Sequence, residues 1–334
     1  MTDLPKTAAD IEAEAEENLA LLGNVKAAIG ETVFGQERVI EETLCVLLAG
    51  GHGLLVGAPG LAKTTLVDAV ATAFGLDWRR IQFTPDLMPA DIIGSEILDG
   101  GADGQRRFRF VPGPVFATLV MGDEVNRASP RTQSALLQSM QERHVTVAGQ
   151  RYDLPEPFHV LATQNPIEQE GTYPLPEAQL DRFLLQINVP YPDAVTERSI
   201  LLATTGGTIQ TTKTVASTGE LQRLQAFVRM MPVGEKVLET IISLVRSARP
   251  DESAAKAVRE SVSWGPGPRA GQALILACKA RALLRGRLAP SLDDVLALAR
   301  PALAHRMALN WSARADGLEA GTLIETLSQK AIAP

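Results

Sequence analysis

A short glycine-containing stretch carries the clearest chemical signal in the chain. Residues 57 to 64 read Gly-Ala-Pro-Gly-Leu-Ala-Lys-Thr, follow the apolar run Leu54-Leu55-Val56 and precede apolar residues at helical spacing. A strand, a loop and a helix in this order form a phosphate-binding loop, whose backbone N–H groups wrap phosphate oxygens. In such a loop Lys63 contacts the β and γ phosphates, and the Thr64 hydroxyl binds Mg²⁺. A glycine-rich turn with a chance lysine is the weaker interpretation, because a strand and a helix flank the loop.

One position departs from the general pattern G-x-x-x-x-G-K-[ST] of such loops. Ala62 stands where a glycine usually precedes the lysine. Left-handed backbone is strained for alanine, because its Cβ crowds the neighbouring peptide group. The sequence therefore predicts that the loop closes with a negative φ at Ala62.

Further polar groups follow two apolar runs of the kind that form buried strands. Asp123 and Glu124 end the run from Leu119 to Gly122, and Asn165 follows the run from Phe158 to Thr163. Ligands of open α/β folds bind at the carboxyl ends of parallel strands, so we expect these side chains at one sheet edge. There Asp123 can hold Mg²⁺ through its water shell, Glu124 can orient the attacking water, and Asn165 can fix that water or sense the γ phosphate. An acidic pair that opens a loop and a simple Asn-Pro turn are the alternatives.

Two arginines stand where a bound anion would explain them. Arg182 lies in a loop before an apolar strand, and it either pairs with Asp181 or reaches a nucleotide held by a neighbouring copy. Arg269 occupies the first turn of a predicted helix, where its charge opposes the helix dipole. A nearby anion would remove that conflict, and a hydrated surface arginine is the alternative.

The elements that must position these groups divide the chain in two. Residues 1 to 195 are predicted to hold an N-terminal helix over 8 to 29 and an α/β core with a central parallel sheet. Alternating residues around glycine-containing turns predict two inserted hairpins, over 94 to 112 and 144 to 152. Residues 196 to 334 are rich in alanine, leucine and arginine at helical spacing, which predicts a helical bundle.

A turn at Val33-Phe34-Gly35-Gln36 precedes a helix predicted for residues 37 to 48. It lies just upstream of the phosphate loop, where it is well placed to meet an adenine. Spacing alone does not establish that contact.

Composition and charge restrict the class of protein. The 334 residues are 45% hydrophobic and 21% charged, as in soluble globular proteins of about two domains. No apolar run reaches the roughly 18 residues that span a bilayer, and no secretory signal is visible, so the cytoplasm is the expected compartment. A net charge of −7 with 4% aromatic residues speaks against a nucleic-acid partner. Cys45 and Cys278 lie in apolar helical patterns and are expected as buried thiols.

Taken together, three blocks resemble the MoxR family of AAA+ ATPases. They are the loop at 57 to 64, the segment Gly-Asp-Glu-Val-Asn-Arg-Ala at 122 to 128, and the long, highly specific block from Ala162 to Phe183. The resemblance covers roughly residues 30 to 310. In that family an alanine commonly precedes the lysine, as Ala62 does here. Gly122 departs from the more usual alanine and affects no catalytic position.

The resemblance implies an AAA+ P-loop nucleotide-binding domain followed by an all-α lid, assembled as a ring, usually a hexamer. It implies ATP and Mg²⁺ as cofactors, with Lys63 and Thr64 in Walker A. Asp123 and Glu124 fall in Walker B, and Asn165 is the first sensor. Arg182 is implied as the finger supplied across the subunit boundary, and Arg269 as a second sensor on the lid that gains and loses the γ phosphate. The predicted nucleotide-binding positions are Gly35, Gln36, Gly57, Ala58, Pro59, Gly60, Leu61, Ala62, Lys63, Thr64 and Thr65.

Members of the family act as chaperone-like ATPases that mature or activate other complexes, often with a protein that bears a von Willebrand factor A domain. The resemblance implies an ATP-driven remodeller of a partner protein, with both hairpins facing the substrate or the pore. A nucleic-acid motor or loader and a metal-chelatase motor subunit are alternatives on the same core, and a small-molecule kinase is another. Salt-dependent DNA binding with stimulated hydrolysis would indicate the motor. A kinase would need no arginine from a neighbour.

Overall fold

A parallel sheet of five strands lies at the centre of the first half of the chain. The structure is a computed structural model and describes residues 8–100, 106–168, 171–206 and 211–332. The strands follow the order β2-β5-β8-β1-β9, and all neighbouring pairs are parallel. Their bounds are β1 (Gly53–Val56), β2 (Trp78–Gln82), β5 (Leu119–Asp123), β8 (His159–Gln164) and β9 (Leu185–Asn188). The predicted central parallel sheet is confirmed.

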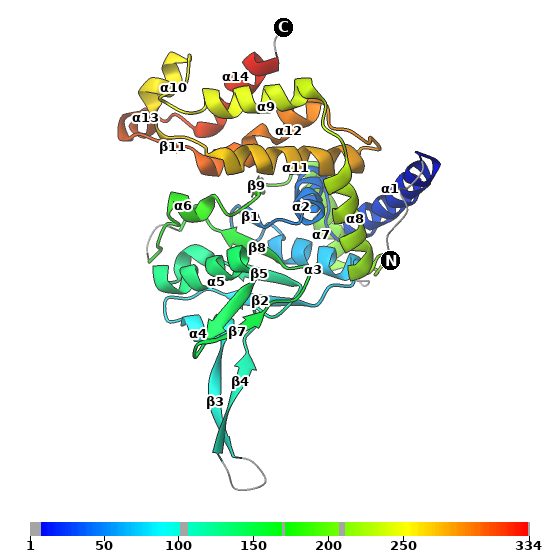
Figure 1. Cartoon of the computed structure of the whole chain (residues 1–334), viewed down its shortest axis with the longest axis vertical. Helices are drawn as coiled ribbons and strands as arrows, with labels where there is room; N and C mark the ends of the chain where they lie inside the picture. Colours follow the sequence, from blue (N-terminus) through cyan, green and yellow to red (C-terminus); the bar gives the residue numbers. More distant parts are fainter. Residues whose placement is uncertain (1–7, 101–105, 169–170, 207–210, 333–334) are drawn as a thin grey trace.

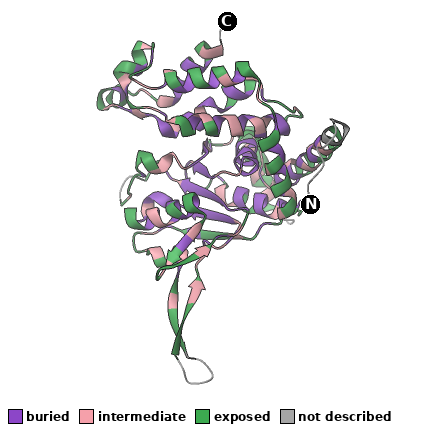
Figure 2. Cartoon of the chain, viewed as in Figure 1, coloured by how far each residue is buried: buried purple, intermediate pink, exposed green. Residues whose placement is uncertain are grey.

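Helices cover both faces of this sheet. Successive strand residues point to opposite sides, and the apolar side chains on each side are buried by helices. Leu55 and Met121 belong to the core that continues into the second half of the chain. Leu54 and Val120 belong to a second core, together with Leu136 of the helix that follows β5. Figure 2 shows the strands buried between these layers. The helices of this half are α1 (Ala8–Gly30), α2 (Glu37–Leu48), α3 (Lys63–Ala73), α4 (Pro89–Ile93), α5 (Pro130–Glu142) and α6 (Glu177–Leu180), with a short turn η1 (Val125–Arg127).

The second half of the chain is helical, as predicted, and lies over one end of the sheet (Figure 1). Its helices are α7 (Ala194–Thr205), α8 (Thr218–Met230), α9 (Glu235–Ser247), α10 (Lys256–Ser261), α11 (Pro268–Leu284), α12 (Leu292–Leu303), η2 (Ala304–Arg306), α13 (Trp311–Ala315) and α14 (Ala320–Ile332). The structure adds a short antiparallel ribbon of β10 (Val262–Trp264) and β11 (Ala308–Leu309). The domain boundary after residue 195 stays a prediction and falls in the first turn of α7. Among the described residues, no helix is long and apolar enough to cross a membrane.

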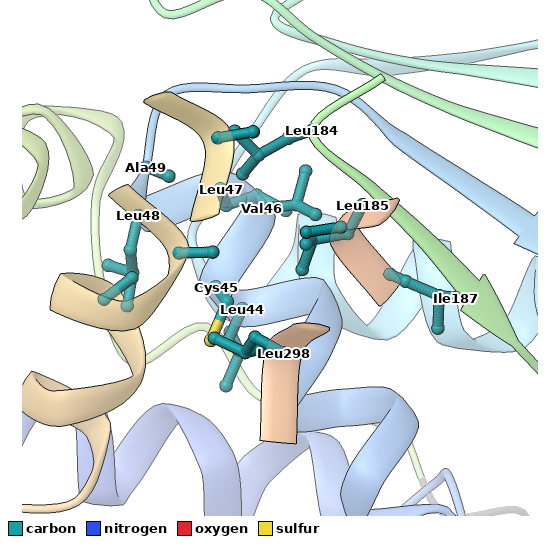
Figure 3. Close-up of a cluster of buried hydrophobic side chains, with 14 of the residues drawn as sticks. Leu44, Cys45, Val46, Leu47, Leu48, Ala49, Leu184, Leu185, Ile187 and Leu298 are labelled. Carbon is teal, nitrogen blue, oxygen red and sulfur yellow. The ribbon is translucent and has the colours of Figure 1, made fainter. Parts of the chain in front are cut away.

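Helix α2 joins the two halves through charge and through apolar packing. The Glu41 carboxylate lies 2.9 Å from Arg281 in the last turn of α11 and 2.8 Å from Arg285, the residue that follows this helix. Arg281 also lies 2.6 Å from the fully buried Asp294 of α12. Figure 3 shows Leu44 and Cys45 of α2 gathered with side chains of β9 and with Leu298 of α12. These contacts fix the C-terminal end of α11 against α2. Cys45 and Cys278 are buried free thiols, as predicted.

Both predicted hairpins are present, and an aromatic stack joins them. The first consists of β3 (Gly94–Gly100) and β4 (Arg106–Pro112), and the second of β6 (His144–Val147) and β7 (Gln150–Asp153). The rings of Phe110 and Tyr152 stack with their centroids 4.0 Å apart. The first hairpin projects far from the body (Figure 1). The predicted tip of this hairpin, residues 101 to 105, lies outside the described residues.

Two buried histidines hold the amino-terminal edge of the sheet. His52 accepts from the Val160 N–H at Nδ1 (3.0 Å) and donates from Nε2 to the Met140 carbonyl (3.2 Å). His159 donates from Nδ1 to the Gly51 carbonyl at 2.8 Å. Burial lowers the pKa of His52 to about 3 and that of His159 to about 4. Both rings are therefore neutral at physiological pH. His52 needs this to accept at Nδ1, and His159 needs it to accept at Nε2 from Gln225 Nε2 at 2.9 Å.

The neutral rings predict a specific acid sensitivity. A folded-state pKa below the unfolded value stabilises the fold above the unfolded pKa and loses that stabilisation as the pH falls. His159→Gln should lower the free energy of unfolding at pH 7. Because glutamine takes up no proton, that difference from wild type should shrink by about 3 kcal/mol on going to pH 4. Urea unfolding across this range measures it, and a difference that does not change with pH would contradict the assignment.

Candidate functional site

The phosphate loop connects β1 to α3 and has the backbone shape of an anion cradle. Gly60 has a φ of +80°, a region that favours glycine. Ala62 also adopts a left-handed conformation, with φ 56° and ψ 24°. The prediction of a negative φ at Ala62 was wrong, because this turn needs a left-handed residue immediately before the helix. Alanine in this region costs about 1 to 2 kcal/mol, and the Leu66 N–H to Ala62 carbonyl bond of 2.9 Å holds the residue at the start of α3.

Lys63 is folded across the mouth of the loop. Its Nζ donates to the carbonyls of Gly57 (2.9 Å) and Ala58 (2.7 Å), and partial burial lowers its pKa. The nearby carboxylates of Asp123 and Glu124 act against this shift. The ammonium thus stands over the loop, held by neutral carbonyls that a phosphate oxygen would replace.

Asp123 and Glu124 lie at the carboxyl end of β5, next to the loop as predicted. Asp123 Oδ1 accepts from the Thr163 hydroxyl at 2.6 Å, and Asp123 Oδ2 accepts from Arg80 Nε at 3.0 Å. Glu124 has a left-handed backbone with φ 56°, which turns it out of the strand direction. Its Oε2 accepts from Gln82 Nε2 and from Arg127 Nη1, each at 3.0 Å.

Asn165 presents a donor that has no partner in the described part of the chain. Its Oδ1 accepts from the Ile167 N–H at 3.1 Å, whereas its buried Nδ2 is unsatisfied. A buried unsatisfied donor is costly, so such an atom is expected to meet a ligand or a water molecule. Asn165 lines a cavity of about 510 Å³ together with Lys63, Thr64, Asp123 and Glu124. The predicted phosphate, metal and sensor residues therefore converge.

A second hollow adjoins the first on Thr65 and Thr204. It has a volume of about 570 Å³ and is lined by Phe34, Asp68 and Ala69, among others. Gly35 packs against Thr196 of α7 so closely that an added Cβ would lie 2.3 Å from the Thr196 methyl. Gln36 is buried, and its Nε2 donates to the Leu61 carbonyl at 3.3 Å. Both residues thus brace the loop and α7, and their contact with an adenine stays a prediction.

The residues of this site suit ATP with Mg²⁺. Thr64 and Asp123 offer hydroxyl and carboxylate oxygens, the ligand type that Mg²⁺ prefers. Within the described ranges, no three His, Cys, Asp or Glu side chains form a metal site of their own. A metal ion here would therefore depend on phosphate oxygens and water as well as on the protein. The unsatisfied Asn165 Nδ2 is placed to donate to a phosphate oxygen or to a water molecule.

The structure does not bring Arg182 and Arg269 to the phosphate loop of their own chain. Both line a cavity of about 250 Å³ that also touches Gly51 and His52, which precede β1. Lys63 follows β1, so the arginines and the loop lie at opposite edges of the sheet. The role of Arg269 as a second sensor stays a prediction. The docking of α11 on α2 through Glu41 holds Arg269 at the edge of the sheet opposite the phosphate loop of its own chain.

The Asp181 carboxylate pairs with Arg306 and Arg269 and not with Arg182. It accepts from Arg306 Nε at 2.8 Å and lies 3.8 Å from Arg269 Nη1. Within the described segments, no hydrogen bond or ion pair holds the Arg182 guanidinium. Partial burial and the neighbouring Arg269 lower the pKa of Arg182. Pairing of Arg182 with Asp181, one of the two interpretations of the sequence, is therefore not observed.

Four residues that contact the two acids were not predicted from the sequence. Thr163 bridges Asp123 to the backbone of Glu124, donating to the first and accepting from the second at 2.9 Å. Arg80, Gln82 and Arg127 bond to the two acids. The polar alternation of Arg80 and Gln82 is visible in the sequence, but its meaning depends on β2 lying beside β5.

Comparison with known proteins agrees with this arrangement. Residues 52–185 match the model of the ATPase family associated with various cellular activities (AAA), and residues 254–327 match the AAA lid domain. The chain is 42% identical over 303 residues to Chaperone MoxR1 of Mycobacterium tuberculosis, which covers 90% of this chain and 79% of that protein. It is 34% identical to Protein MoxR of Paracoccus denitrificans, covering 86% of this chain and 88% of that one. The crystal structure of a candidate ATPase from Cytophaga hutchinsonii superposes with a TM-score of 0.88 at 37% identity, over 96% of each chain.

Proposed function

Because the chain belongs to the MoxR family of AAA+ ATPases, we propose that it hydrolyses ATP at the subunit interfaces of a ring, expected to be a hexamer, and so remodels or activates a partner protein. The phosphate end of the nucleotide lies in the cavity between the loop and the ends of β5 and β8. Lys63 exchanges its two carbonyl partners for phosphate oxygens. The adjoining hollow beside Phe34 and Thr65 receives the nucleoside.

The side chains around the cavity divide the chemistry among them. Thr64 and Asp123 would hold Mg²⁺, which supplies positive charge to the β and γ phosphates. The Glu124 carboxylate orients a water molecule and takes its proton. Asn165 donates from Nδ2 to the γ phosphate or to that water, which satisfies the buried donor. Thr163 fixes Asp123 and Glu124 relative to one another through its hydroxyl.

The placement of Arg182 and Arg269 at the sheet edge opposite Lys63 is the observation that carries the proposal. Phosphoryl transfer depends on positive charge around the γ phosphate. Among the described residues that line this cavity, only Lys63 and Arg80 are cationic. A second copy, arranged head to tail, would bring Arg182 and Arg269 to the same phosphates. We therefore place both arginines in the site of the neighbouring subunit.

The first hairpin is the part of the chain that we assign to the client protein. Phe108 is 72% exposed, and Leu98, its cross-strand partner, is 51% exposed. An apolar pair on a projecting ribbon suits a protein ligand rather than solvent. A protein with a von Willebrand factor A domain is the expected accessory partner, and the buried thiols of Cys45 and Cys278 suit work in the cytoplasm.

The shared site predicts that turnover depends on assembly. ATP turnover per chain should rise with protein concentration, and the rise should coincide with the growth in mass measured by analytical ultracentrifugation in magnesium and ATP. A lone subunit lacks an arginine finger, so its rate of ATP turnover should be at least about 10³-fold lower than that of the ring. A protein that stays monomeric with ATP and still turns over at the full rate would overturn the proposal.

A further inference from the structure

Strand β2 presents two polar side chains to the acids at the end of β5. Arg80 and Gln82 point to one face of β2, because the intervening Ile81 is buried in the core on the other face. The two strands are neighbours, with Gln82 opposite Asp123 in the register. Arg80 lines the proposed nucleotide cavity together with Asp123 and Glu124.

The contacts form an uninterrupted chain from one acid to the other. Arg80 donates to Asp123 Oδ2 from Nε at 3.0 Å and from Nη2 at 2.5 Å. Arg80 Nη2 also donates to Gln82 Oε1 at 2.7 Å. Gln82 Nε2 in turn donates to Glu124 Oε2 at 3.0 Å. Arg80 thus holds Asp123 directly and Glu124 through Gln82.

Arg80 occupies the position that a metal cation would need. Asp123 Oδ1 already accepts from Thr163, so Oδ2 is the oxygen left for a cation or its water shell, and Arg80 covers it. The Arg80 side chain is 47% exposed and lines the same cavity as Lys63. It therefore has room to swing away from Asp123.

We propose that Arg80 is a resident counter-ion that Mg²⁺ displaces from Asp123. The inference rests on the proposed function, because it assumes that ATP with Mg²⁺ occupies this cavity. Without the metal, Arg80 neutralises Asp123 and, through Gln82, keeps Glu124 engaged. When Arg80 leaves, Gln82 loses its partner, and Glu124, still bonded to Arg127, is freer to turn and orient water. Arg80 is thus a positioning residue that links metal occupancy to the second acid.

The test compares binding of a hydrolysis-resistant ATP analogue by calorimetry, in Mg²⁺ and in EDTA. In the Arg80→Gln variant the bare Asp123 repels the phosphates in EDTA, whereas Mg²⁺ binds without a competitor. The dissociation constant in EDTA divided by that in Mg²⁺ should therefore rise about fivefold over wild type, the size expected of one partly exposed charge pair. Arg79→Gln is the matched control, because Arg79 lies on the same strand and instead lies 3.7 Å from Asp77. It should leave the ratio unchanged. Arg80→Lys, which keeps the charge without the two-pronged contact, should give an intermediate ratio.

Other results would overturn the inference. Equal loss of affinity in Mg²⁺ and in EDTA would make Arg80 a phosphate ligand instead of a competitor of the metal. An unchanged ratio in Arg80→Gln would show that Asp123 is open to the metal in wild type. If wild type and Arg79→Gln both failed to bind the analogue at all, the proposed function itself would fall.

Discussion

Arg182→Ala is expected to lower ATP turnover by about 10³ to 10⁵, the contribution of an arginine finger to phosphoryl transfer. Arg182 is not held by any hydrogen bond or ion pair in the described residues, so its removal leaves no buried partner unsatisfied. The fold and the binding of ATP should therefore survive, because Lys63 and the loop belong to the other edge of the sheet. Steady-state turnover and equilibrium ATP binding separate the two effects. Arg223→Ala removes an exposed arginine that, in the described part of the chain, pairs with Glu220 alone, and it should retain full turnover.

Mixed rings test whether the arginine acts across the interface. Subunits with Lys63→Ala lack the loop cation, and subunits with Arg182→Ala lack the finger, so each is inactive alone. Random mixing in equal amounts gives about one interface in four with an intact loop and an intact finger. Turnover should reappear on mixing. A self-contained kinase would gain nothing, which would refute the shared site.

The same experiment decides which subunit Arg269 serves. If Arg269 acts on the neighbour together with Arg182, a mixture of Arg269→Ala and Arg182→Ala subunits contains no complete interface and stays inactive. If Arg269 acts on its own chain, the same mixture regains turnover. Arg269 lies 3.8 Å from Asp181, which also pairs with Arg306 and directly precedes Arg182. This position beside Arg182 favours the first outcome.

Local sequence was sufficient for the elements that carry the phosphate chemistry. The helix predicted for 37 to 48 has these bounds in the structure, and the strands before Asp123 and Asn165 end at those residues or one earlier. Such agreement is expected where apolar period, glycine and polar strand ends all indicate the same element. It extends to the convergence of Lys63, Asp123 and Asn165, because carboxyl ends of parallel strands share one edge.

Contacts between distant segments were the part that the sequence could not give. The position of Arg269 relative to the sheet could not be predicted, because α11 is held by the ion pair of Glu41 with Arg281, residues that lie 240 positions apart in the chain. Arg80 lies 43 positions from Asp123, and the pairing of β2 with β5 follows only from the strand order. The prediction of a negative φ at Ala62 was wrong for a different reason. The strain of a left-handed alanine, about 1 to 2 kcal/mol, is small compared with the hydrogen bonds that fix the loop.

Glu124→Gln is the second change with a large expected effect. Glutamine keeps the size of the side chain and one acceptor oxygen, so a bond from Gln82 or Arg127 can persist. It removes the charge that takes a proton from water, and hydrolysis should fall by about 10² to 10⁴. Nucleotide binding should be retained, because Lys63, Thr64 and Asp123 are untouched. Single-turnover hydrolysis and equilibrium binding measure the two quantities, and unchanged turnover would remove Glu124 from the mechanism.

Two further variants give this prediction its controls. Glu168→Gln neutralises an exposed acid 3.9 Å from Arg127 and should reduce turnover far less, because Glu168 does not reach the cavity of the phosphate loop.

The ATP-bound Glu124→Gln ring should hold its client long enough to isolate it, whereas Glu124→Gln combined with Phe108→Ser should lose the client and still bind ATP. Because Phe108 is exposed and does not line the cavity of the phosphate loop, only its contact with a client would separate these two variants. Equal recovery of the same protein from both would place the client elsewhere than on the first hairpin.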